Sequence, residues 1–223
     1  YTSSGTINGL GNEAVTLTDT SINASVLITL DANTTGSIDA SSITALSGTA
    51  HEINSVYTSF GISGLDNEVI TVTDASITVA QANVISAFTT SVVKATISVG
   101  DIATLAGLNE IGNAYTVTVT DASVDASALN TLDSKTTVNI IASAVNTITG
   151  TAADINTIYS AGAARTINGL GNEAVTLTDT SINASVLITL DANTSGAIDA
   201  SSITALSGTA HEINSVYTSS GTI

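Results

Sequence analysis

The sequence has no cysteine, and only three lysine and arginine residues stand against nineteen acidic ones. Without cysteine the chain can form neither a disulfide framework nor a thiolate metal site, and it offers no thiol nucleophile. Its formal net charge of −16 repels phosphate backbones and anionic lipid surfaces, so we expect no nucleic-acid partner. Such a deficit of cations favours a salty medium or bound divalent cations, and both indicate a location outside the cell.

Aromatic residues are scarce too, at 3% of the chain, and long apolar runs are missing. No run reaches the roughly 18 residues that a membrane-spanning helix needs, so we expect no membrane insertion. No basic-then-apolar signal segment stands at Tyr1, and we expect a segment of a longer protein. What the sequence does have is 43% apolar content, which is enough for a folded core. Because this content is mostly small aliphatic residues, we expect many thin repeated contacts.

Internal repetition is the main feature of the sequence. Thr6–Thr34 returns unaltered as Thr166–Thr194, and Val117–Asp133 closely resembles Val15–Asp31. Val69–Thr90 is a more diverged copy. We therefore predict a single repeat array over residues 1–223, with modules at approximately 1–56, 57–115, 116–158 and 159–223.

Each module is expected to hold two strand-plus-helix units. The first strand alternates aliphatic residues with threonine, as in Ile70–Thr73, and this pattern is typical of a half-buried strand. Helix signals follow: Asn23 is a candidate N-cap, and Thr49 with Glu52 has the spacing of a capping box. Gly162 stands where a helix is expected to end. The second strand of each module is expected around Ile38, Val93, Ile140 and Ile198.

A strand and a short helix cannot bury an apolar face alone, so neighbouring units must stack. Parallel strands on one side and helices on the other satisfy both patterns, and we predict an α/β solenoid of eight coils, each coil being one strand-plus-helix unit. The alternative is an all-β parallel β-helix, because the helical segments are rich in threonine and serine. Tyr1–Ile7 is identical to Tyr217–Ile223, so the array could continue at both ends and stack head to tail into filaments.

Two segments, "LSGTAHEINSVYTS" (Leu46–Ser59) and "ITGTAADINTIYSAG" (Ile148–Gly162), carry a resemblance to known repeats. They resemble the TGTAA-D/E-IN units of very large repetitive bacterial surface proteins, including cyanobacterial ones. They are also similar to short phrases in phage tail-fibre repeats. Module two departs from the motif with "AGLNEIGNAY". The resemblance implies a secreted surface, adhesin or filament-forming role, and it carries over no catalytic residue.

One aspartate follows the first strand of every module: Asp19, Asp74, Asp121 and Asp179. Such a residue is typical of a turn whose side chain accepts nearby backbone N–H groups before a helix. The same carboxylates are the candidate metal ligands, as contributions to a Ca²⁺ site together with Asp66, Asn67 and Glu68. No EF-hand or glycine-aspartate nonapeptide pattern supplies the remaining ligands, so we favour the turn role.

No catalytic constellation stands out, and we expect no enzyme activity and no cofactor other than calcium. His51 and His211 are one position in two copies and are expected to be exposed helix residues. The tyrosines recur at one module position, and their rings are expected to pack on the neighbouring layer with their hydroxyls in water. The sequence thus predicts a structural segment of an extracellular surface protein, acting as stalk, adhesin spacer or filament subunit. A calcium- or glycan-binding repeat is the alternative.

Overall fold

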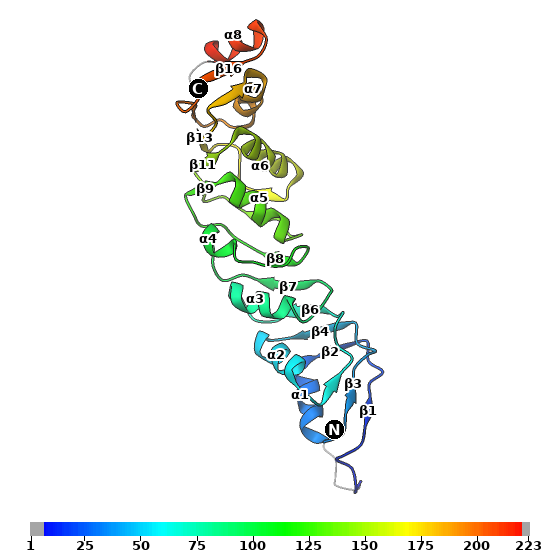
Figure 1. The fold of residues 1–223 in the computed structure, drawn as a ribbon. Helices are drawn as coiled ribbons and strands as arrows, with labels where there is room; N and C mark the ends of the chain where they lie inside the picture. The colour runs from blue at the N-terminus through cyan, green and yellow to red at the C-terminus, as the bar shows by residue number, and fades with distance from the viewer. Residues whose placement is uncertain (1–6, 220–223) are drawn as a thin grey trace. The chain divides into compact units, whose positions relative to one another are not determined.

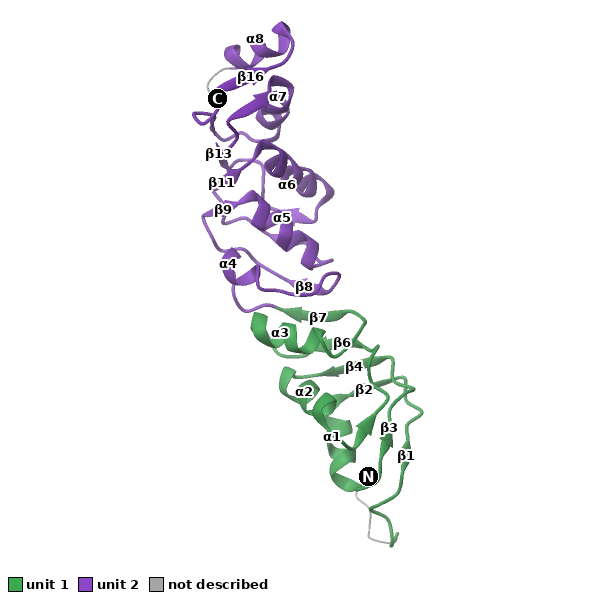
Figure 2. Ribbon diagram, in the orientation of Figure 1, with its two compact units in different colours: residues 1–96 green, residues 97–223 purple. Residues whose placement is uncertain are grey.

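The chain forms two compact units, residues 1–96 and 97–223 (Figure 2), and the computed structural model describes residues 7–219. In each unit parallel strands alternate with helices, so the predicted α/β class is confirmed (Figure 1). The all-β alternative is wrong, because the capping residues start helices despite the threonine and serine content. The identical segments Tyr1–Ile7 and Tyr217–Ile223 lie largely outside the described residues.

Unit 1 contains three helices packed in succession beside two sets of parallel strands (Figure 1). The first set is β1, β3 and β5, and the second is β2, β4, β6 and β7. The strands are β1 (Val15–Thr16), β2 (Ser21–Asn23), β3 (Ile38–Asp39), β4 (Ala45–Gly48), β5 (Ile62–Ser63), β6 (Val69–Val72) and β7 (Val93–Thr96). The helices are α1 (Ala24–Asn33), α2 (Ala50–Thr58) and α3 (Val79–Ser86).

Unit 2 repeats this arrangement with five helices in succession. The helices are α4 (Ile102–Leu105), α5 (Ala126–Lys135), α6 (Ala152–Ala164), α7 (Ala184–Asn193) and α8 (Ala210–Thr218). The strands are β8 (Ala114–Thr116), β9 (Ser123–Asp125), β10 (Ile140–Ile141), β11 (Thr147–Gly150), β12 (Ile167–Asn168), β13 (Ala174–Leu177), β14 (Ser181–Asn183), β15 (Ile198–Asp199) and β16 (Ala205–Ser207). Strands β9, β11, β13 and β15 are successive neighbours, β10 pairs with β12, and β14 pairs with β16, all in parallel.

Strand pairing joins each coil to the next one. In unit 1, Leu46 pairs with Ile22 on one side and with Ile70 on the other. In unit 2, Ile148 pairs in the same way with Val124 and Val175. Aliphatic side chains therefore stack in rows across successive strands, and the middle ones are at most 1% exposed. The second strands that the sequence predicts around Ile38, Val93, Ile140 and Ile198 are confirmed as β3, β7, β10 and β15.

Most helix starts agree with the sequence prediction, and one helix end does not. The Asn23 side chain accepts from Ser25 N, and both halves of the capping box of Thr49 and Glu52 are present. The predicted end at Gly162 is wrong. Helix α6 continues to Ala164, and Arg165 ends it in the left-handed conformation, with φ 64°. This conformation usually belongs to glycine at such a position.

A threonine hydroxyl ties the end of the first helix of every module back to the first strand. In module three, the buried Thr136 hydroxyl donates to Tyr115 O at 2.7 Å and accepts from Val138 N at 3.0 Å. The same hydroxyl also accepts from Tyr115 N at 3.0 Å, so it joins backbone groups of two segments that lie 21 positions apart. The four equivalent threonines are Thr34, Thr89, Thr136 and Thr194.

Candidate functional site

Three of the four module aspartates bind the starts of helices that precede them in the chain. Asp74 Oδ2 accepts a 2.6 Å hydrogen bond from the backbone N–H of Ala50, the first residue of α2. Asp179 Oδ2 accepts from Ala152, the first residue of α6, at 2.8 Å. Asp121 makes the third contact of this kind, with the first residue of α4, at 2.7 Å. We call these three contacts the aspartate clamps.

Each clamp completes a helix start that is otherwise only partly satisfied. The first N–H groups of a helix have no partner inside the helix, and a negative charge beside them is favourable. At α2 the Thr49 hydroxyl accepts from Glu52 N, and the Glu52 carboxylate accepts from Thr49 N. Asp74 takes the N–H that lies between these two, at Ala50. The start of the helix is therefore held by its own module and by the next one.

Asp19 is the one module aspartate that makes no clamp among residues 7–219. It is exposed, and its side chain accepts no hydrogen bond from the described residues, whereas Asp179 is half-buried and bonded. The sequences around the two are the same from Ile7 to Thr34 and from Ile167 to Thr194. The difference therefore comes from the neighbouring coil and not from the local sequence.

The clamps differ from the turn role that we expected, because their partners are distant in the chain. Asp74 bonds a residue 24 positions earlier and Asp179 one 27 positions earlier. Glu68, a further candidate calcium ligand, is fully buried and accepts a 2.6 Å hydrogen bond from the hydroxyl of Tyr57. Asp66 and Asn67 are exposed. Within residues 7–219, no cluster of three or more His, Cys, Asp or Glu side chains is arranged to hold a metal ion.

Two tyrosines make a second contact, each with the glutamate that directly precedes a strand of the following coil. Tyr57 at the end of α2 donates to Glu68, and its ring stacks on Phe88 with centroids 4.7 Å apart. Tyr159 on α6 donates to Glu173 at 3.2 Å. Burial raises the pKa of Tyr57, and the hydrogen bond to Glu68 adds to this rise. The expectation that these hydroxyls lie in water is therefore wrong at Tyr57 and Tyr159.

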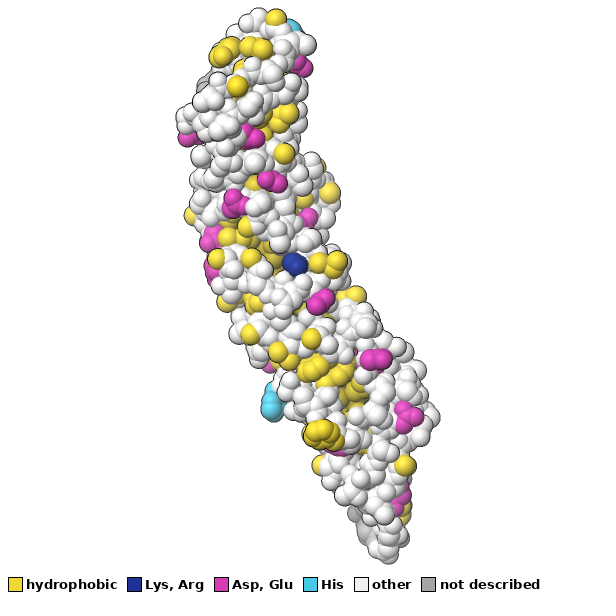
Figure 3. All heavy atoms as spheres, in the orientation of Figure 1, with side chains coloured by type: hydrophobic (Ala, Val, Ile, Leu, Met, Phe, Trp, Pro, Cys, Tyr) yellow, Lys and Arg dark blue, Asp and Glu magenta, His cyan; other side chains and the backbone are white. Residues whose placement is uncertain are grey.

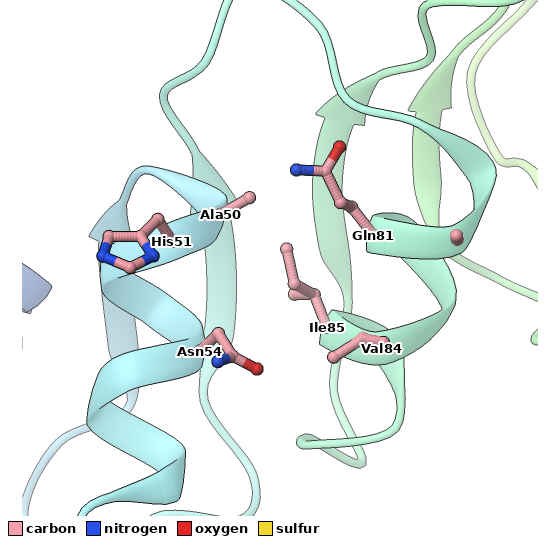
Figure 4. Close-up of a pocket in the computed structure, with 7 residues that line it drawn as sticks. Ala50, His51, Asn54, Gln81, Val84 and Ile85 are labelled. Carbon is pink, nitrogen blue, oxygen red and sulfur yellow. The ribbon is translucent and has the colours of Figure 1, made fainter.

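The histidines are exposed on α2 and α8, and one of them borders a groove. The groove between α2 and α3 has a volume of about 310 Å³. Figure 4 shows Asn54 from α2 and Ile85 from α3 pointing into the space between the two helices, whereas the His51 ring extends away from α3. Its lining residues are Ala50, His51, Asn54, Ala80, Gln81, Val84 and Ile85, which include no carboxylate and no cysteine.

Carboxylates are scattered over the visible face of each unit and do not gather into one patch (Figure 3). None of the helices in residues 7–219 is long and apolar enough to cross a membrane. No family model matches the chain, and neither the curated proteins nor the solved structures give a match.

Sequence reasoning found the aspartates but missed what they contact. The clamps, the tyrosine–glutamate bonds and the threonine ties all join residues 11 to 27 positions apart. A signal was present in the sequence. Each of the clamped alanines Ala50 and Ala152 directly follows a capping threonine, Thr49 or Thr151, and each module aspartate directly follows a predicted first strand. Periodicity along the sequence did not show that the helix start of one unit and the aspartate of the next lie in contact.

Replacing Asp179 with alanine should destabilise the protein. The substitution removes the charged acceptor at the start of α6, and we expect a loss of about 1–2 kcal/mol in the free energy of unfolding. Asp19→Ala is the matched control, since the same residue in identical local sequence makes no clamp, and its effect should stay below about 0.5 kcal/mol. Urea unfolding at low protein concentration measures both, and equal losses would contradict the clamp.

The structure also predicts a loss of stability in acid that depends on helix-capping carboxylates. Hydrogen bonds from the Ser127 hydroxyl and from the N–H groups of Ser127 and Ala128 lower the pKa of Asp125, the N-cap of α5. A carboxyl whose pKa is lower in the folded state stabilises fully above the unfolded value, about 3.9. That contribution is lost as the pH falls through the folded value.

Asp125→Asn tests this prediction, because asparagine caps the equivalent helix at Asn23. Between pH 7 and about pH 2.5 the variant should lose less melting temperature than the parent chain, since the cap no longer takes up a proton. Glu110→Gln, an exposed position in the same unit, is the control and should behave as the parent does. Parallel pH profiles for the parent and Asp125→Asn would contradict the prediction.

Proposed function

We propose that the chain is a non-enzymatic structural repeat segment of a long extracellular surface protein. Its coils form an α/β solenoid that acts as stalk, adhesin spacer or filament subunit and stacks head to tail. The partners of each coil are neighbouring modules of the same chain or other copies of it. Nucleic acid and membrane insertion have no part in this function.

The proposal rests on what the polar side chains of the modules contact. Asp74 and Asp179 each accept a hydrogen bond from the start of a helix in the preceding module. Tyr57 and Tyr159 each donate to a glutamate that lies 11 or 14 positions further along the chain, directly before the next long strand. The same pair of contacts occurs where module one meets module two and where module three meets module four. A repeated unit whose polar groups hold it to the next unit fits a spacer, in which the number of units sets the length.

The extracellular location rests on composition and on the resemblance of the TGTAA-type segments. A net charge of −16 with few cations is tolerated best where salt screens the repulsion. The motif at Ile148–Gly162 now has a structural meaning, because it covers β11, the Thr151 cap and most of α6. Repeats of this kind in bacterial surface proteins would then encode one strand, one cap and one helix each.

The solenoid predicts how size changes with repeat number. Residues 7–166 are one full period, and a second copy can be inserted after residue 166, because residues 167–194 repeat residues 7–34. Each new junction then has the sequence of an existing one. For a linear stack the maximum dimension in small-angle X-ray scattering should rise by about 1.7-fold, in proportion to length, against about 1.2-fold for a compact globule. The smaller increase would overturn the proposal.

Calcium binding is the alternative function, and the four module aspartates are its candidate ligands. If the chain is a spacer, the melting temperature in CaCl₂ should match that in NaCl of equal ionic strength. If the module aspartates bind calcium, the melting temperature should rise to a plateau with Ca²⁺ and not with matched salt, and Asp19→Asn should reduce the rise. Asp19 suits this test because it makes no clamp, so its loss does not weaken the fold by itself.

A further inference from the structure

Modules one and four contain long identical segments, so the burial of their equivalent residues can be compared directly. Residues 7–34 and 167–194 are identical, as are residues 38–59 and 198–219. The first module has a described neighbour only after it, and the fourth has one only before it. Differences in burial between identical residues therefore show what a neighbouring coil covers.

Among residues 7–219, nothing covers the surface of module one that faces away from module two, which we call the leading face. Ile7 is 74% exposed, whereas Ile167 is 1% exposed. Val15 is half-buried and Val175 is buried. Strand β1 pairs with β3 alone among the described strands, whereas its counterpart β13 pairs with β11 and β15. The leading face thus has an open strand edge and an uncovered aliphatic row.

In the described part of the chain, nothing covers the surface of module four that faces away from module three, which we call the trailing face. Leu206 is half-buried and Ala210 is exposed, whereas their counterparts Leu46 and Ala50 are buried. Strand β16 pairs with β14 alone in the described chain, whereas β4 has a neighbour on each side. A groove of about 370 Å³ lies here, and its lining includes Ile203, Leu206, Val216 and Tyr217.

We propose that the leading face of one copy of this chain binds the trailing face of another through a joint like those inside the chain. In this joint Asp19 of one copy clamps the N–H of Ala210 at the start of α8 of the other. The Tyr217 hydroxyl, which belongs to a side chain 77% exposed here, donates to Glu13. Strand β1 adds to β16 in parallel and closes the groove with its aliphatic row.

Every contact in this joint exists elsewhere in the chain with the same residue types. The trailing side copies helix α2, where Ala50 is clamped by Asp74 and Tyr57 is bonded to Glu68. The leading side copies the part of module four where Asp179 and Glu173 are the acceptors. The proposal rests on the proposed stacking function and specifies its partner and register.

The register follows from the internal pairs. Leu46 pairs with Ile70, and Ile148 pairs with Val175, so Leu206 should lie opposite Val15. Ala205 should then lie opposite Ala14 of the other copy. Both alanines are exposed. Neighbouring strands are about 4.8 Å apart, which is within the reach of a disulfide.

Cysteine pairs test the register, because the chain has no cysteine of its own. Ala14→Cys chains and Ala205→Cys chains are mixed at about physiological salt and oxidised. A disulfide-linked heterodimer is expected to form. Thr16→Cys mixed with Ala205→Cys is the control, since two residues along a strand add about 6.6 Å and place the thiols out of reach. Equal yields from the two mixtures, or no link in the first, would overturn the joint.

Sedimentation velocity tests the clamp in the joint. Asp19→Ala should weaken self-association about tenfold and leave the melting temperature unchanged at concentrations at which the chain is monomeric. Asp179→Ala should lower the melting temperature and leave association unchanged, because its clamp lies inside unit 2. Association that is insensitive to Asp19→Ala, or a parent chain that stays monomeric at high concentration, would refute the joint. Linear growth on insertion of a period would still support the spacer function, so the two proposals can fail separately.

Discussion

Backbone groups at helix starts and strand edges must find partners, and in this chain the partners come from the next coil. A coil has one short helix and strands of two to four residues, which are too small to cover their own polar ends or their own apolar row. The aspartate clamp solves the first problem, and the parallel pairing of rows such as Ile22, Leu46 and Ile70 solves the second. Both solutions require a neighbour, so stability increases with each coil added.

The dependence of each coil on its neighbour explains why residues in identical sequence segments can have different environments. Asp19 and Asp179 share their surroundings in sequence, yet one is exposed and the other bonds the N–H of Ala152. The same holds for Leu46 and Leu206, one buried and one half-buried. The local sequence determines which side chains a coil presents, and the adjacent coil determines whether these side chains are bonded and buried. Copying a module without change keeps both sides compatible, which explains how Thr166–Thr194 can repeat Thr6–Thr34 without drift.

Local features of the fold could be predicted from the sequence, and contacts between coils could not. The alternation at Ile70–Thr73 and the caps at Asn23 and Thr49 act within a few residues, so their patterns are visible in one segment. The end of α6 was not predicted, because the left-handed conformation that ends a helix is typical of glycine and here Arg165 adopts it. The clamp partners were missed because spacing within a module does not give the rotation of one coil against the next. The module boundaries stay a prediction. The two compact units divide between residues 96 and 97, a point that lies inside predicted module two.

The acidity of the chain has a structural cause that does not require a ligand. Helix starts offer N–H donors and need acceptors, and a carboxylate is the strongest acceptor among the side chains. Asp125 and Glu52 cap their own helices, while Asp74 caps the helix of the preceding coil. A cationic side chain offers no acceptor, so it cannot replace any of them. Repeating such a coil adds acids at every turn and few bases, and the negative charge grows with the array. Salt around the protein then lowers the cost of this repulsion, and the helix starts account for part of the acidic composition.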